Sequence, residues 1–249
     1  MENAISFNIF DPAVVSAKGL KGFDLVYLGS EFCQNRLPSE GEIAGLRAVY
    51  RGPIVLVTAL MTTDGLVRAE RLLVKIARGR RKMEVVVNDW GFLHLLRQKY
   101  RAAVKPILGR LLMWEIAEMD KAFLNAFCRE RGIDSVETDN DLILGRLAGF
   151  AGAVNFHYPY RFRSMSRFCP FGRRFNSGPC ARSCAGVFAR LSAKNLKGPL
   201  FMSGNAYFSE NRPSRGPCIG RLVKDFFPRP DTAAARLPGS LRLKSKSLA

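Results

Sequence analysis

Acidic residues are scarce in this chain. Its 249 residues include 21 Asp and Glu against 39 Lys and Arg, which gives a formal net charge of +18. Between Asp141 and Glu210 there is no acidic residue at all, although Lys and Arg recur throughout that stretch. Such an excess is typical either of a surface that binds a polyanion or of a solvated basic face. RNA is therefore one possible partner.

Long apolar runs are also absent. No stretch approaches the roughly 20 apolar residues that a membrane span needs, and the opening MENAISFNIFDP has no basic segment followed by an apolar one. We therefore expect a soluble, cytoplasmic protein without a membrane span. Because the cytosol keeps thiols reduced, disulfides are a poor explanation for the six cysteines. Metal ligation or redox chemistry explains them better.

Familiar catalytic signatures are missing too. The sequence has no Walker A motif, no dinucleotide glycine fingerprint after a strand candidate, no serine hydrolase elbow and no His-Glu-x-x-His helix. The first two absences argue against a nucleotide-binding doubly wound sheet. The last two leave proteolysis without visible machinery.

Short apolar runs alternate with amphipathic stretches, a pattern typical of βα units. Strands are expected at residues 5–10, 25–29, 54–60, 83–87, 104–108, 135–138, 154–158 and 200–203, and helices at 12–20, 40–50, 66–77, 91–100, 116–131, 142–150 and 185–193. This order predicts an α/β fold, a single TIM-barrel-like (β/α)8 domain over residues 1–211, with an open doubly wound sheet as the alternative. Residues 212–249, rich in Pro, Arg, Lys, Ala and Ser, are expected to form a disordered basic tail.

Four cysteines follow strands whose ends would meet. Cys33 comes after the second strand candidate, and Cys169, Cys180 and Cys184 come after the seventh. Because the loops after all barrel strands open at one face, the four thiols are expected to converge there. Four thiolates suit either a 4Fe-4S cluster or a structural zinc. One remote ligand and three close ones favour the cluster over the paired knuckles of zinc sites, and scattered structural thiols remain the third interpretation.

Polar residues at other strand ends are, as a group, candidates for substrate binding or acid-base catalysis, although individually such residues more often serve as caps or in loop hydrogen bonds. They are Asp89, Glu137, Asp139, His157 and Tyr160. Four arginines near the cysteines could offset the negative charge of a thiolate-bound cluster: Arg167, Arg173, Arg174 and Arg182. Cys128, on an apolar helix face, is predicted to be a core residue, and Cys218 to have no specific role.

Four short motifs carry a family resemblance. VYLG at residues 26–29 with Cys33 just after it, VNDWGFL at 87–93, KPILGR at 105–110 and GNA at 204–206 resemble the collagenase-like peptidase family U32, most closely its UbiU/UbiV branch. The resemblance covers about residues 4–210. This chain departs from the family pattern in its shorter length and its basic tail.

The resemblance implies a barrel-like fold with a 4Fe-4S cluster on Cys33, Cys169, Cys180 and Cys184. It also implies a heterodimer with a homologous U32-family protein, working in oxygen-independent hydroxylation of an isoprenoid quinone precursor during ubiquinone biosynthesis. Sister branches hydroxylate pyrimidines in transfer or ribosomal RNA, which is the alternative function. A non-enzymatic metal-binding scaffold is the third, and peptidase activity is not expected despite the family name.

Overall fold

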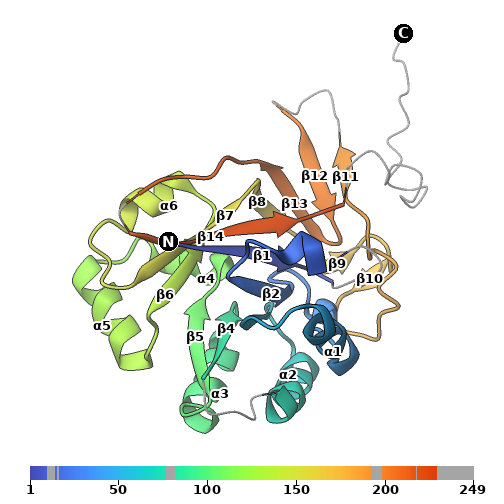
Figure 1. Ribbon diagram of the computed structural model, residues 1–249, viewed down its shortest axis with the longest axis horizontal. Helices are drawn as coiled ribbons and strands as arrows, with labels where there is room; N and C mark the ends of the chain where they lie inside the picture. Colours follow the sequence, from blue (N-terminus) through green and yellow to red (C-terminus); the bar gives the residue numbers. More distant parts are fainter. Residues whose placement is uncertain (10–14, 16, 77–81, 192–197, 217, 229–249) are drawn as a thin grey trace.

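A computed structural model describes residues 1–9, 15, 17–76, 82–191, 198–216 and 218–228. Eight parallel strands close into a barrel in the order β1-β14-β7-β6-β5-β4-β3-β2 (Figure 1). Their bounds are β1 (Glu2–Phe7), β2 (Leu25–Gly29), β3 (Ile54–Val57), β4 (Met83–Val87), β5 (Val104–Leu108), β6 (Ser135–Thr138), β7 (Ala153–Tyr158) and β14 (Ile219–Phe226). The predicted (β/α)8 architecture is confirmed.

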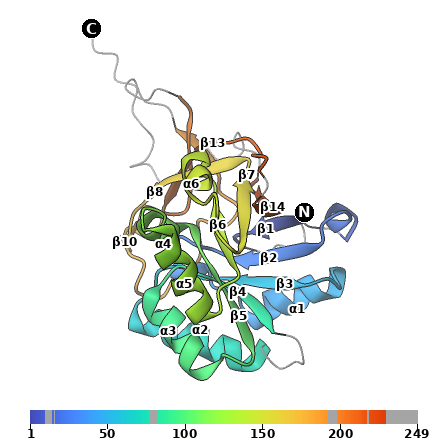
Figure 2. The same ribbon diagram turned by 90° about the vertical axis from the view of Figure 1, so that its left-hand side faces the viewer.

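Helices follow β2 to β6 and cover the outside of that part of the barrel (Figure 2). They are α1 (Glu40–Val49), α2 (Thr63–Ile76), α3 (Trp90–Lys99), α4 (Arg110–Ile116), α5 (Lys121–Arg131) and α6 (Asp141–Arg146), with 3-10 turns η1 (Ala17–Leu20) and η2 (Gln34–Arg36). The single helix predicted at 116–131 begins late and is preceded by α4, because Asp120 caps a new helix at α5. Among the residues predicted as a helix at 12–20, positions 12–14 and 16 lie outside the described residues.

An all-β addition replaces the helix between β7 and β14. β8 (Tyr160–Met165), β11 (Ala189–Leu191), β12 (Leu200–Ser203) and β13 (Ala206–Glu210) form a four-stranded antiparallel sheet, and β9 (Phe168–Cys169) pairs with β10 (Arg174–Phe175). Residues 189–191 are therefore a strand, and the helix predicted at 185–193 is wrong for them. Phe162, Phe188, Phe201 and Phe208 of this addition pack with Phe32, which follows β2. The aromatic cluster thus covers the end of the barrel where β2 finishes.

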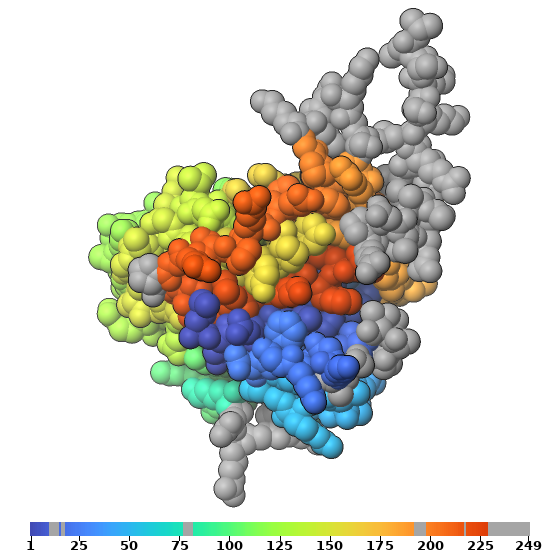
Figure 3. Space-filling view, turned by 45° about the horizontal axis from the view of Figure 1, so that its top comes forward, coloured from blue at the N-terminus to red at the C-terminus, as the bar shows by residue number. Residues whose placement is uncertain are grey.

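The eighth barrel strand is not the one predicted. Residues 200–203 form β12 of the added sheet, whereas β14 pairs in parallel with both β1 and β7. Because β14 lies at residues 219–226, the predicted boundary at residue 211 is wrong, and part of the expected tail belongs to the barrel. In Figure 3 the blue N-terminal residues lie directly beside the red residues near the C-terminal end of the described chain. Residues 229–249 lie outside the described residues.

The core has two layers. Small and branched side chains such as Val55, Val86, Ile107 and Val223 fill the barrel interior, and a larger apolar cluster joins the strands to the helices. Cys128 belongs to the outer layer, only 2% exposed, and burial raises the pKa of its thiol to about 11. Its predicted core role is confirmed. Within the described residues, no helix is long and apolar enough to cross a membrane.

Candidate functional site

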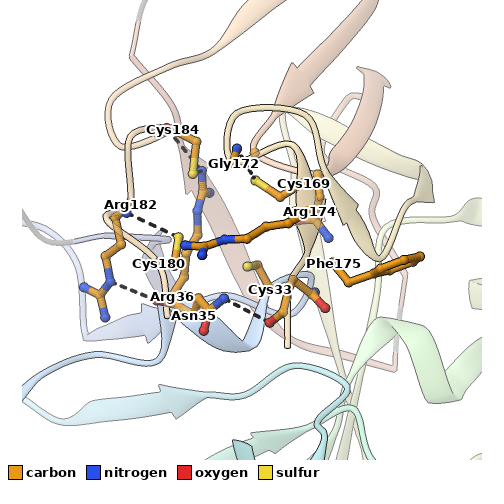
Figure 4. Close-up of a pocket in the computed structure, with 13 residues that line it drawn as sticks. Cys33, Asn35, Arg36, Cys169, Gly172, Arg174, Phe175, Cys180, Arg182 and Cys184 are labelled. Carbon is orange, nitrogen blue, oxygen red and sulfur yellow. Dashed lines mark hydrogen bonds between the residues drawn. The ribbon is translucent and has the colours of Figure 1, made fainter. Parts of the chain in front are cut away.

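The four predicted cysteines line a single cavity (Figure 4). Cys33 comes from the loop after β2, Cys169 from β9, and Cys180 and Cys184 from the loop that follows β10. Cys33, Cys169 and Cys184 are buried, and Cys180 is exposed. Segments that are more than 130 residues apart in the sequence therefore bring their thiols to one place. The predicted convergence of Cys33 with the three later cysteines is present in the fold.

Cys33 is positioned by a tight turn at the end of β2. Gly29 has a φ of +117°, and a Cβ at this position would lie 2.3 Å from the Val57 carbonyl oxygen of the neighbouring strand. Only glycine fits there, so the chain can leave the barrel at once and enter η2 immediately after Cys33. Burial raises the pKa of the Cys33 thiol, and repulsion from Cys184 and Cys180 adds to the rise.

The loop carrying the later cysteines is held by side chains of η2. Gln34 Nε2 donates to the Asn176 carbonyl at 2.8 Å, and Asn35 Nδ2 donates to the same oxygen at 2.9 Å and to Gly178 at 3.2 Å. Gln34 is fixed in turn, because its Oε1 accepts from the Thr62 backbone at 2.9 Å. The residues that follow Cys33 therefore act as the platform for the other three cysteines.

Arg182 completes the attachment from the loop side. Its guanidinium donates to the carbonyls of Asn35 at 2.8 Å and Leu37 at 2.5 Å, and pairs with the Glu42 carboxylate at 2.8 Å. Its φ is +52°, a left-handed conformation that costs a non-glycine residue free energy. Its backbone N–H lies 3.3 Å from Cys180 Sγ. The three side-chain contacts hold Arg182 in this strained conformation, in which its backbone amide points at the Cys180 thiol.

Arg36, the last residue of η2, contacts Cys184. It is only 5% exposed, and its Nη2 lies 3.3 Å from both the carbonyl oxygen and the Sγ of Cys184. Nη1 donates to Ser203 Oγ at 3.2 Å. Gly204 packs against this guanidinium, since a Cβ there would lie 2.9 Å from Arg36 Nη2. Arg36 thus presents a buried positive charge to one of the four thiols.

The donor set suits a group bound by four thiolates, but the cavity is tight. Its free volume is about 20 Å³, room for about one water molecule. Figure 4 shows the Arg174 side chain extending across the space between Cys180 and Cys169, and its guanidinium donates to the Pro179 carbonyl. No three His, Cys, Asp or Glu side chains of the described residues are spaced as ligands of one metal ion. The donor chemistry therefore fits a cluster, and its entry requires Arg174 to move and the four thiols to rearrange.

A second polar cluster lies inside the barrel. Arg110 is 4% exposed and binds three carboxylates: Glu31 through Nε at 2.7 Å, and Asp139 and Asp225 through Nη1 at 3.1 Å each. Glu31 also accepts from the Arg110 backbone at 2.9 Å and from Asn88 Nδ2 at 3.1 Å. The carboxylates come from three distant parts of the chain. This cluster ties the loop after β2 to strands on the other side of the barrel.

His157 continues this network. Its Nδ1 lies 2.9 Å from Asp225 and its Nε2 lies 2.6 Å from Glu137. Burial and the Arg110 charge lower the pKa of His157, but Asp225 and Glu137 outweigh them and raise it to about 10. The ring is therefore an imidazolium at neutral pH. Burial raises the pKa of Asp225, but Arg110 and His157 together hold it below its usual value.

The predicted catalytic candidates divide into three groups. Glu137, Asp139 and His157 do lie together, but inside the barrel at 3% exposure or less rather than at an open mouth. Asp89 caps α3 by accepting from the Phe92 backbone at 2.9 Å. Tyr160 packs against Phe188, Phe201 and others in the aromatic cluster. None of the five lines the cysteine cavity.

One short segment joins the two polar regions. Glu31 binds Arg110, Phe32 stacks on Phe162 with its ring centroid 5.2 Å from the Arg110 guanidinium carbon, and Cys33 lines the cavity. Asn205 fastens the segment from outside, because its Nδ2 donates to the Phe32 carbonyl at 2.9 Å. The orientation of Cys33 is therefore set by the charge network two residues earlier.

Sequence reasoning missed several of these residues. Arg36, Gln34 and Asn35 directly follow Cys33, and that proximity was the available signal. Of the four arginines expected near the cysteines, Arg174 and Arg182 line the cavity, whereas Arg167 and Arg173 do not. Arg110 and Asn205 lie within the motifs KPILGR and GNA, so the family resemblance already pointed to these two positions.

Comparison of the chain with known protein families, with curated proteins and with solved structures finds no match. The function is therefore inferred from the architecture and the side-chain geometry of the chain itself.

Proposed function

We propose that Cys33, Cys169, Cys180 and Cys184 bind a 4Fe-4S cluster in a protein of an oxygen-independent hydroxylation system. The observation that carries this proposal is the meeting of four thiols from two distant segments in one cavity. Soft thiolate ligands select iron-sulfur clusters or zinc. When bound, a cluster supplies one-electron redox chemistry.

The residues around the cavity have roles that suit such a group. Four thiolates carry a large negative charge, and cations and amide donors near them offset it. Arg36 faces Cys184, the Arg182 amide faces Cys180, and the Gly172 amide lies 3.4 Å from Cys169 Sγ. Three of the four thiols thus already have an N–H donor within reach of sulfur.

The family resemblance supplies the finer part of the proposal. The motifs VYLG, VNDWGFL, KPILGR and GNA favour work with a homologous partner on an isoprenoid quinone precursor in ubiquinone biosynthesis. Asn88, Arg110 and Asn205, from three of these motifs, hold the segment that ends at Cys33. The motifs therefore coincide with the residues that shape the site, which supports a shared site chemistry.

The proposal is tested by changing each cysteine to serine. After anaerobic reconstitution with iron and sulfide, Cys33→Ser should lose iron and sulfide as severely as Cys169→Ser, Cys180→Ser or Cys184→Ser, because each removes a ligand of the same group. Cys128→Ser and Cys218→Ser are matched controls that should retain the metal. Stoichiometric zinc after anaerobic purification, or full iron content in folded Cys33→Ser, would contradict the proposal.

RNA hydroxylation is the second candidate, favoured by the charge of +18 and by the acid-free stretch that contains three of the cysteines. Binding to RNA phosphates releases counterions, so affinity falls steeply as salt rises. Filter binding should measure the affinity for transfer RNA at salt concentrations from about 50 to 200 mM. A fall in affinity of about tenfold or more over this range would support RNA as the substrate. Absence of binding at low salt would leave the quinone-precursor proposal.

A non-enzymatic scaffold would show a bound cluster that no reductant or oxidant changes.

A further inference from the structure

A second cavity lies next to the cysteine cavity. Its volume is about 210 Å³, and its apolar walls include Ile9, Val15, Val187, Phe226 and Phe227. These residues come from the segment after β1, the loop after Cys184 and the end of β14. A cavity of about 150 Å³ with such walls is large enough to hold benzene. This one has room for a ring of that size and a small substituent.

Arg36 and Cys184 line both cavities, so they form the partition between them. Arg36 is also the sole charged side chain among the described residues that line the second cavity. Its hydrogen-bond contacts are to neutral groups: Ser203 Oγ and the carbonyl and sulfur of Cys184. Its Nε has no hydrogen-bond partner, and no described carboxylate lies within ion-pair distance. A buried cation without an anionic partner is costly, and an anion nearby relieves that cost.

We propose that this cavity binds a small organic anion, a molecule with one carboxylate against Arg36 and a ring-sized apolar body between Val15, Val187 and Phe226. The apolar walls favour the body by removing it from water. The guanidinium, which has no anionic partner among the described residues, favours the carboxylate, because the low dielectric of a buried site strengthens the attraction. This proposal stands on the cavity and on Arg36, and holds whether or not the cysteines bind a cluster.

The obvious competitor for Arg36 is the cysteine site itself. A thiolate or a cluster at Cys184 would also partner the guanidinium, across the other face of the partition. The test therefore uses metal-free protein with reduced thiols, in which no cluster charge is present. Success or failure there is separate from the result of the cysteine-to-serine series.

The probes are benzoate and benzyl alcohol, which have similar ring bodies and differ in charge. Methyl-labelled protein is titrated with each at neutral pH and followed by NMR. Benzoate should shift the methyl signals of Ile9, Val15 and Val187 and leave that of Val86, inside the barrel, unchanged. Benzoate should bind at least about tenfold more tightly than benzyl alcohol, because only benzoate can form an ion pair with Arg36.

Variants at Arg36 connect the affinity to the charge. Arg36→Met should remove the preference for benzoate, and Arg36→Lys should keep part of it because the positive charge remains. Arg163→Met is the matched control, since Arg163 is an exposed arginine on β8 that bonds Ser209. Equal affinity for the two probes in the native protein, or shifts confined to other methyl groups, would overturn the proposal even if Arg36→Met does not fold.

Discussion

The barrel interior and the cysteine cavity both bury charge, and they do so in different ways. In the interior, Arg110 meets three carboxylates and His157 lies between two, so the charged groups have partners fixed on separate strands or directly after them. Around the cavity, the cysteine loop has little regular structure and is held by side chains of η2 and by Arg182. The interior network is complete as it stands, whereas the cavity has converging thiols and an arginine without an anionic partner.

That difference suggests a division of labour. A network whose partners are in place on the barrel strands and the turns after them stabilises one arrangement and resists change, because removing any member leaves a buried charge alone. A loop held by a few contacts can rearrange its thiols when a group enters. The interior therefore fixes the place of Cys33, and the loop supplies the movement needed for binding.

The strongest test of the interior is the loss of its central cation. Arg110→Met leaves Glu31, Asp139 and Asp225 buried together without a guanidinium, so we expect the free energy of unfolding to fall by about 3–5 kcal/mol. Urea unfolding followed by circular dichroism measures it. Arg146→Met is the control, because its partner Glu118 and Arg146 itself are mostly exposed and their pair contributes little. A loss at Arg110 no larger than at Arg146 would mean that the network does not stabilise the barrel.

The charge on His157 predicts a pH dependence. Its pKa rises from about 6.5 in the unfolded chain to about 10 in the fold, so its contribution is complete below pH 6.5 and is lost as pH approaches 10. Between pH 7 and 8.5 the free energy of unfolding should fall by about 1.4 kcal/mol per pH unit. His157→Gln should remove this slope, and His94→Gln, an exposed histidine, should retain it. Equal slopes in both variants would assign the titration elsewhere.

The cavity side of the comparison is tested at Arg182. Arg182→Ala loses the contacts to Asn35, Leu37 and Glu42 while keeping the strained backbone, so the loop should open locally. We expect cleavage between residues 169 and 184 by a broad-specificity protease to accelerate by about tenfold, with little change in the urea midpoint. Arg190→Ala, an exposed arginine on β11, is the control. A large fall in the urea midpoint would show that the loop and barrel unfold as one unit.

The smallest expected effect is a difference between two thiols of the same cavity. Cys180 is exposed, whereas Cys33 is buried and burial raises the pKa of its thiol. Because the thiolate is the reactive form, Cys180 should react with a soluble disulfide reagent before Cys33. Mass spectrometry after brief labelling of the metal-free protein measures the order. Labelling of Cys33 first would mean that the cavity opens on the side of β2.

The sequence predicted the barrel from seven strands and missed the eighth for a physical reason. In β14 the inward positions after the irregularity at Gly220 are Arg221, Val223 and Asp225, all buried. Two of these three are charged because they pair inside the barrel, so the usual apolar alternation is interrupted and the strand resembles a polar tail. Residues 200–203 were a strand, but an apolar run does not reveal which sheet it joins.

The candidate site was predictable in part. Cysteine spacing and strand order brought Cys33 to the later cysteines, because loops after parallel barrel strands share one end. The partners Glu31, Arg110 and Asp225 could not be found in this way, since their pairing depends on contacts between residues far apart in sequence. Glu137 and His157 were noticed at strand ends, but their burial depends on partners such as Asp225 and Tyr27 on distant strands, which no local pattern indicated.

The position of β14 has a consequence for how the protein is made. Arg221 pairs with Glu2 across a sequence separation of 219 residues, and Asp225 supplies a carboxylate to both Arg110 and His157. A chain growing on the ribosome therefore carries an open sheet, with the edges of β1 and β7 unpaired, until β14 has been synthesised. Nascent chains of this protein should depend on chaperones until residues 219–226 emerge and close the ring.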